Sequence, residues 1–232
     1  MKKYRLIFSI IFYTILFSLF STFAMADNNN AKKRVVYRTI TINPSMSGEK
    51  IQAIFRNLKS VKKIIFKNGR YVFNRTIKLR LCKNIEMIGQ GKVELIGKNP
   101  TKDVIFIQYC GNITLKNIRF RHLNKVIVRS EKDIKLYLKA EKATLIKVKK
   151  SNKIKILNCY ITFTTGFGII ARRVRKLTIS GCEIFNNLVG IFLNSCENVL
   201  ICKCNIFNNK EPFGVYRVRK LKMKKNTIEF KK

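Results

Sequence analysis

The chain has 232 residues, of which 49 are lysine or arginine and 12 are aspartate or glutamate, so its formal net charge is +37. A hydrophobic fraction of 47% is enough for a sizeable core, and one folded domain is expected. So strong a positive charge argues against a folded protein that acts without an anionic partner. Nucleic acid, an anionic lipid surface and an acidic polysaccharide are the three candidate partners.

Residues 1–26 have the pattern of a secretory signal peptide. Basic residues near the start precede the apolar run 6–20, and Ala24-Met25-Ala26 offers small residues for cleavage before Asp27. An uncleaved membrane anchor is the alternative interpretation. We expect an exported protein, periplasmic or extracellular, without stable membrane insertion after cleavage. Nucleic acid is then not expected as a partner, and residues 27–34 are expected to be disordered.

The next segment, SGEKIQAIFRNLKS, predicts a short helix. Ile51, Ile54, Phe55 and Leu58 lie on one helical face, and Ser47 is a plausible N-cap. Two strands around an Asn-Gly turn follow at once in KKIIFKNGRYVFN. A helix at this place would cap the open N-terminal end of a stacked β-structure.

A repeat of about 22 residues dominates the rest of the chain. Its first apolar residue recurs at Ile154, Leu177, Val199 and Leu221, in steps of 23, 22 and 22. Each repeat holds three short strands with an apolar face, separated by turn residues. Such a unit is typical of one coil of a parallel β-solenoid, which buries its apolar face by stacking on the next coil.

One coil departs from this period. The segment VIVRSEKDIKLYL, residues 126–138, supplies two strands of a further coil but no third. We expect an incomplete coil with a protruding loop.

Seven cysteines fall mostly into two columns of the repeat. Cys159, Cys182 and Cys204 form one column, which Asn226 continues. Cys82, Cys110 and Cys196 form the other, and Cys202 is expected to face outward. The thiols are interpreted either as small residues of an internal ladder or as disulfides between neighbouring coils.

Several segments resemble the repeats of the pectate-lyase-like superfamily, among them NITLKNIRF, NKIKILNCYI, KLTISGCEIFNNLVGIFL and NVLICKCNIFNN. The resemblance covers about residues 35 to 232. It implies an all-β fold, a single-stranded right-handed parallel β-helix (solenoid) with a short N-terminal capping helix, in one domain over residues 35–232. It does not imply one chemistry, because lyases, hydrolases, epimerases, adhesins and binding proteins share this fold.

The segments that carry catalysis in polygalacturonase-type members, N-T-D and G-H-G, are missing, and the chain has no tryptophan. Glu86 is the only candidate outward acid at the first position of the middle strand, and no column of the repeat is expected to hold two acids. Candidate catalytic residues are Arg119, Arg121 and the sole histidine, His122, which is otherwise an ordinary turn residue. We expect neither a metal site nor a cofactor.

Basic residues recur before the middle strand of three coils. They are Lys149, Lys150, Lys153, Arg172, Arg173, Arg175, Lys176, Arg217, Arg219 and Lys220. Two interpretations stay open: an anion-binding stripe, or a solvated surface that reflects a lysine-rich composition. The first predicts a non-catalytic exported protein that binds an acidic polysaccharide or an anionic envelope polymer. The alternative function is a small polysaccharide lyase acting on an acidic glycan. The oligomeric state is left open.

Overall fold

A computed structural model describes residues 38–124 and 143–230. The predicted signal peptide at 1–26, the predicted disordered stretch at 27–34 and the two strands predicted within 126–138 lie outside the described residues. In the part of the chain that is described, no helix is long and apolar enough to cross a membrane.

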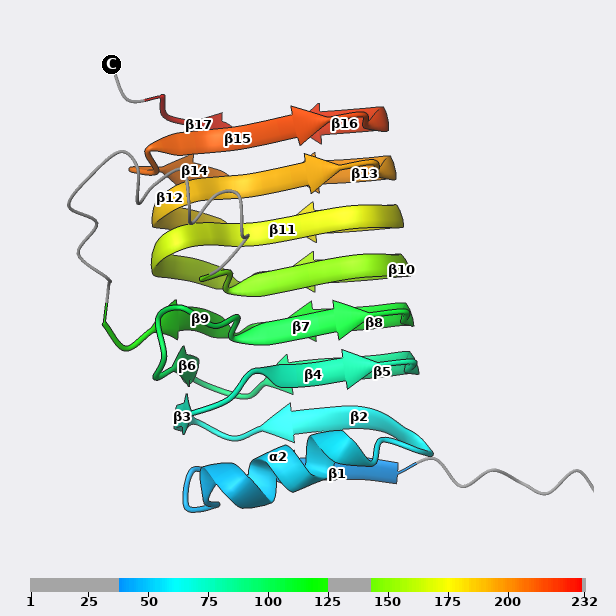
Figure 1. The fold of residues 1–232 in the computed structure, drawn as a ribbon, viewed down its shortest axis with the longest axis vertical. Coiled ribbons are helices and arrows are strands. Elements are labelled where there is room, and N and C mark those ends of the chain that lie inside the picture. Colours follow the sequence, from blue (N-terminus) through cyan, green and yellow to red (C-terminus); the bar gives the residue numbers. More distant parts are fainter. Residues whose placement is uncertain (1–37, 125–142, 231–232) are drawn as a thin grey trace, which may run out of the picture. The chain divides into compact units, whose positions relative to one another are not determined.

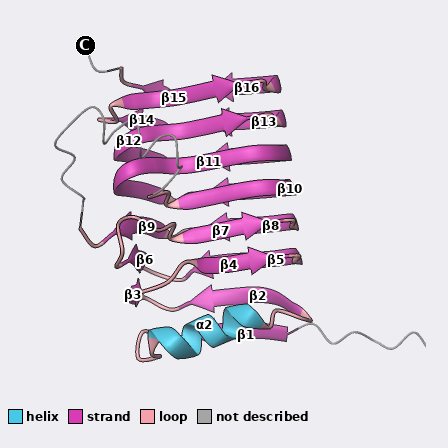
Figure 2. Ribbon diagram, in the orientation of Figure 1, coloured by secondary structure: helices cyan, strands magenta, loops and turns pink. Residues whose placement is uncertain are grey.

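The described residues form 17 parallel strands and one helix, wound into a solenoid (Figures 1 and 2). Its strands stack in three columns. The first contains β4 (Ile77–Arg80), β7 (Ile105–Gln108), β10 (Ile146–Leu157), β11 (Tyr160–Ser180), β12 (Glu183–Asn194) and β15 (Glu211–Tyr216). The second contains β1 (Arg38–Ile42), β2 (Val61–Phe66), β5 (Lys83–Gly89), β8 (Gly111–Lys116), β10, β11, β13 (Glu197–Cys202) and β16 (Arg219–Lys224).

The third column contains β3 (Gly69–Phe73), β6 (Val93–Gly97), β9 (Arg119–His122), β11, β12, β14 (Asn205–Phe207) and β17 (Thr227–Ile228). Strands β10, β11 and β12 belong to more than one column because they continue around a corner of the coil. The expected parallel β-solenoid is therefore confirmed, including the two strands on either side of the Asn68-Gly69 turn.

The core lies inside the coils. Alternate residues of each strand point inward and stack on their equivalents one coil away, as Ile154 does on Leu177 and Leu177 on Val199. These three side chains are at most 1% exposed. Burying each such side chain contributes about 1.5–3 kcal/mol, so the stacked apolar columns stabilise the fold.

The predicted cysteine column is also present. Residues on both sides of Cys159, Cys182 and Cys204 pair in register, so these thiols lie at one corner of consecutive coils. All three are buried. All seven cysteines are free thiols, which agrees with the internal-ladder interpretation.

The helix α2 spans Gly48–Arg56. The side chain of Ser47 accepts a hydrogen bond from the amide of Lys50 at 3.3 Å, as expected of an N-cap. Ile51 and Phe55 are buried in the main core. The predicted helix is present, and its apolar face contacts the strands of the first coils.

Candidate functional site

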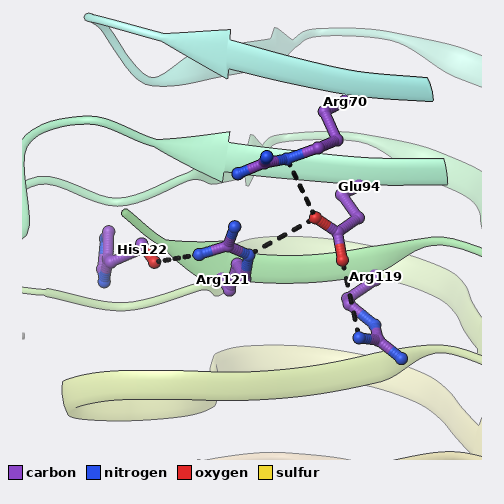
Figure 3. Close-up of polar contacts among 5 residues, drawn as sticks. All are labelled: Arg70, Glu94, Arg119, Arg121 and His122. Carbon is purple, nitrogen blue, oxygen red and sulfur yellow. Dashed lines mark hydrogen bonds and ion pairs between the residues drawn. The ribbon is translucent and has the colours of Figure 1, made fainter. Parts of the chain in front are cut away.

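The third column carries a cluster of three arginines around one carboxylate, which we call the arginine cluster (Figure 3). Glu94 of β6 points outward and lies in register between Arg70 of β3 and Arg119 of β9. Its oxygens are 3.5 Å from a nitrogen of each of Arg70, Arg119 and Arg121. The side chain of Glu94 is only 11% exposed. One carboxylate therefore holds three guanidinium groups in place, and the cluster keeps two uncompensated positive charges.

A cleft opens beside this cluster, where the guanidinium carbon of Arg119 lies 4.9 Å from the centre of the Tyr160 ring. The cleft has a volume of about 280 Å³. Lys92, Asn117 and Asn158 line it together with Arg119 and Tyr160. Two cations, an aromatic face and two side-chain amides are groups that could hold a sugar ring with an acidic substituent.

The acids of this column do not form a hydrolytic pair. Glu183 shares the column with Glu94, so the expectation that no column holds two acids is wrong here. Arg119 and Tyr160 stand between them in register. Three strand spacings separate the two acids by about 14 Å, which exceeds the roughly 5–9.5 Å that glycoside hydrolysis requires.

His122 is not in the cleft. It ends β9 with its ring inside the coil, 0% exposed, and is not a turn residue as expected. Its Nε2 lies 2.9 Å from the carbonyl oxygen of Lys102, and its Nδ1 lies 3.1 Å from Oγ1 of Thr164. Burial lowers the pKa of His122, while the contact with the Lys102 carbonyl partly opposes this. The structure thus brings Arg119 and Arg121 together and separates the His122 ring from both.

Gly97 explains the inward position of that ring. It pairs with His122 one coil away, and a β-carbon at Gly97 would lie 2.8 Å from Cδ2 of His122. The missing side chain of Gly97 therefore provides the space for the imidazole.

The ten basic residues predicted to form a stripe meet at one corner, between the first and second columns, and we call them the basic corner. Lys149 pairs in register with Arg172 of the next coil. Six of the ten, including Arg173 and Lys176, have positive φ between 49° and 59°. The left-handed conformation usually favours asparagine or glycine. The backbone conformation therefore does not explain why lysine or arginine occupies these positions.

The basic corner is interrupted once. The coil that follows Arg172–Lys176 carries no cation at the equivalent positions. Its residues there are Asn194, Ser195, Glu197 and Asn198. Glu197 accepts a hydrogen bond from Arg219 of the following coil at 3.3 Å. The highest cation density is consequently confined to two neighbouring coils, at 149–153 and 172–176, where no residue is acidic.

One aromatic residue extends the basic corner toward the preceding coil. Nζ of Lys150 donates a hydrogen bond to the hydroxyl of Tyr109 at 3.1 Å. This hydrogen bond, together with the charge of Lys150, lowers the pKa of Tyr109. Tyr109 is 40% exposed and could contact a ligand that lies along the corner.

One apolar residue beside the corner, Ile170, is covered. Ile170 is 0% exposed and packs with Phe167 and Val189 in a small second cluster, against which Phe192 also packs. Ile170 is therefore not a platform for a sugar ring. Among the described residues, no three histidine, cysteine, aspartate or glutamate side chains lie close enough together to hold a metal ion.

The arginine cluster was only partly predicted. Arg119 and Arg121 were candidates, but Glu94 and Arg70 were not. The alternation VEL in β6 and RFR in β9 was the available signal, because it places Glu94 and Arg119 at equivalent outward positions. Reading it required the register between two early coils, which the 22-residue repeat does not give.

A family described as the right-handed beta helix region matches residues 103–231 of the chain. Comparison with curated protein sequences finds no match. Similar solved structures include a proposed glycosyl hydrolase from Parabacteroides merdae, with a TM-score of 0.62 and 15% identity over 82% of this chain and 95% of that one.

Two further structures are similar. A polygalacturonase from Erwinia carotovora ssp. carotovora has a TM-score of 0.66 and 15% identity, over 82% of this chain and 62% of the polygalacturonase. The catalytic domain of an α-1,3-glucanase in complex with nigerose has a TM-score of 0.59 and 13% identity, over 81% of this chain and 33% of the glucanase domain. At these identities the similarity concerns the fold, which is that of the pectate-lyase-like superfamily.

Proposed function

The chain belongs to the family of right-handed β-helix proteins, and from that premise we propose that it binds an acidic polysaccharide or another anionic polymer of the cell envelope. The basic corner is the binding surface, and binding involves no chemical change of the polymer. A carbohydrate is the favoured class of polymer because a polygalacturonase and an α-1,3-glucanase share the fold.

The observation that carries this proposal is the cation density of two adjacent coils. Seven of the ten basic residues lie within 149–153 and 172–176, and these stretches contain no acid. Like charges one strand spacing apart repel by about 0.9 kcal/mol per pair even at the dielectric constant of water. A linear polyanion lying along the corner would offset this repulsion between coils.

Charge substitution at the corner tests the proposal. The variant Arg173→Ser, Arg175→Glu, Lys176→Asn copies the residues that the next coil carries as Ser195, Glu197 and Asn198. All three replaced side chains are exposed, and this chain already accommodates the new residues at equivalent backbone positions. We expect this variant to be retained more weakly on a heparin column, equivalent to a loss of at least about ten-fold in affinity. Binding of the wild type should fall steeply with salt.

A matched control changes the same net charge elsewhere. In Lys203→Asn, Lys224→Glu, Lys225→Asn, two of the replaced residues also have positive φ and all three are exposed. This variant should elute close to the wild type. Equal loss of retention in both variants would show that binding follows net charge, and the basic corner would then be abandoned as a site.

We further propose that the protein acts after export, in the periplasm or outside the cell. The signal-peptide pattern of residues 1–26 supports this. Mass spectrometry of the mature protein should find Asp27 at its N-terminus, whereas an intact Met1 in the membrane fraction would support an anchor instead.

The helix α2 is proposed to cap the open end of the core. Its Phe55 is buried and stacks on Phe66 of β2, with ring centres 6.5 Å apart. Phe55→Asp should therefore expose the core, which would appear as increased binding of a hydrophobic dye; unchanged dye binding would contradict the capping role.

A polysaccharide lyase is the second candidate function, and the cleft beside the arginine cluster favours it. Arg119 could neutralise the carboxylate of a uronic acid there, with the hydroxyl of Tyr160 in the same cleft. New unsaturated ends that absorb in the ultraviolet, formed by the wild type and not by Tyr160→Phe, would move the assignment to the lyase.

A further inference from the structure

A recess beside α2 gathers four cations from separate stretches of chain. Its volume is about 370 Å³. Arg56 comes from the last turn of α2, and Lys102 comes from the segment between β6 and β7. Arg75 lies just before β4, and Lys78 lies within it. None of the described residues lining the recess is acidic. The nearby Asp103 forms an ion pair with Lys147 at 3.6 Å, so its charge is already matched.

Hydrogen bonds fix the backbone of the segments that carry these cations. Nε2 of Gln52 donates to the carbonyl of Arg75 at 2.9 Å, and the ring of His122 contacts the carbonyl of Lys102 at 2.9 Å. The hydroxyl of Thr76 donates to the carbonyl of Asp103 at 2.7 Å. The cations therefore extend from positions that are fixed before any ligand arrives, which reduces the entropy lost on binding.

The lining also has an apolar part. Phe55 and Ile77 are buried, at 7% and 1% exposure, whereas the four cations are exposed. Gln52 and Thr76, which also line the recess, are half-buried. The volume is at the lower end of the roughly 300–1,000 Å³ that is usual for ligand pockets.

We infer that this recess is a separate binding site for a small organic phosphate or sulfate monoester. The doubly or singly charged ester group would meet the cations at the rim, and the organic part would lie against the remaining exposed edge of Phe55 and the side chains of Gln52 and Thr76. Both ester groups present three terminal oxygens to the converging cations, and the phosphate monoester carries up to two charges, whereas a carboxylate presents two oxygens and one charge. The site shares no residue with the basic corner, so it does not depend on the proposed polymer binding.

Calorimetric titration of the full chain tests this inference. The probes are glucose 6-phosphate, N-acetylglucosamine 6-sulfate, inorganic phosphate and uncharged glucose. At least one ester should bind, more tightly than inorganic phosphate, and glucose should not bind. Arg75→Gln combined with Lys102→Gln should raise the Kd of that ester at least ten-fold. The control Lys59→Gln combined with Lys98→Gln removes two exposed lysines outside the recess and should leave the Kd unchanged.

The variant of the basic corner serves as a second control and should keep its affinity for the ester. The four replaced side chains are exposed, so each double variant is expected to fold like the wild type. Urea unfolding of each variant checks this. The inference is overturned if neither ester binds the wild type, if inorganic phosphate binds as tightly as the ester, or if both double variants lose affinity equally.

Discussion

The backbone amide of Cys204 donates a hydrogen bond of 2.9 Å to Oδ1 of Asn226 in the next coil. Two coils earlier the same bond is made to sulfur, since the amide of Cys159 donates to Sγ of Cys182 at 3.5 Å. Thiol and carboxamide thus perform one task at this corner: each accepts the backbone amide hydrogen of the cysteine one coil earlier. This explains why asparagine continues a column of cysteines.

Cys182→Ala should therefore lower the free energy of unfolding by about 1–3 kcal/mol, because it leaves a buried amide of Cys159 without an acceptor. Urea unfolding measures the effect. The control is Cys202→Ala, whose half-buried thiol donates a hydrogen bond to the hydroxyl of Ser180 at the coil surface and which should change stability by less than about 0.5 kcal/mol. Equal effects of the two substitutions would contradict the role of the ladder.

Stability is expected to fall on mild acidification because of His122. Burial lowers its pKa in the folded protein below the unfolded value of about 6.5, so the unfolded chain binds the proton first. The stability from neutral His122 is complete above the unfolded pKa and is lost as the pH falls toward the folded pKa. His122 is the sole histidine, so His122→Gln should flatten the dependence of unfolding free energy on pH between about 7 and 5. An unchanged slope in this variant would refute the assignment.

Glu94→Gln should destabilise the fold by about 2 kcal/mol, because three arginines would lose their shared counter-charge. Added salt should recover part of this loss, since it screens the repulsion between the arginines. Urea unfolding at low and high sodium chloride tests both statements. Glu197→Gln is the matched control: its partner Arg219 is 78% exposed, so the change should be within about 0.5 kcal/mol. A salt-independent loss for Glu94→Gln would argue for packing in place of charge.

The arrangement of the core was predictable from the sequence. Residues such as Leu177 and Ile179 alternate with outward residues and recur about every 22 positions, and this periodicity dictates both the inward face and the stacking of coils. The column of Cys159, Cys182 and Cys204 and the meeting of Lys149 with Arg172 follow from the same count. Local alternation and a constant period suffice for such predictions because each coil rests on a near copy of itself.

The environments of individual outward residues were decided by the tertiary structure. Glu94 meets Arg70 and Arg119 across coils whose lengths differ from the later repeat, so their register depended on turns that no period fixes. His122 points inward because Gly97, in a different coil, leaves room for its ring. In both cases the deciding contact joins residues that are distant in sequence and occur once, and only packing in three dimensions selects among the possible partners.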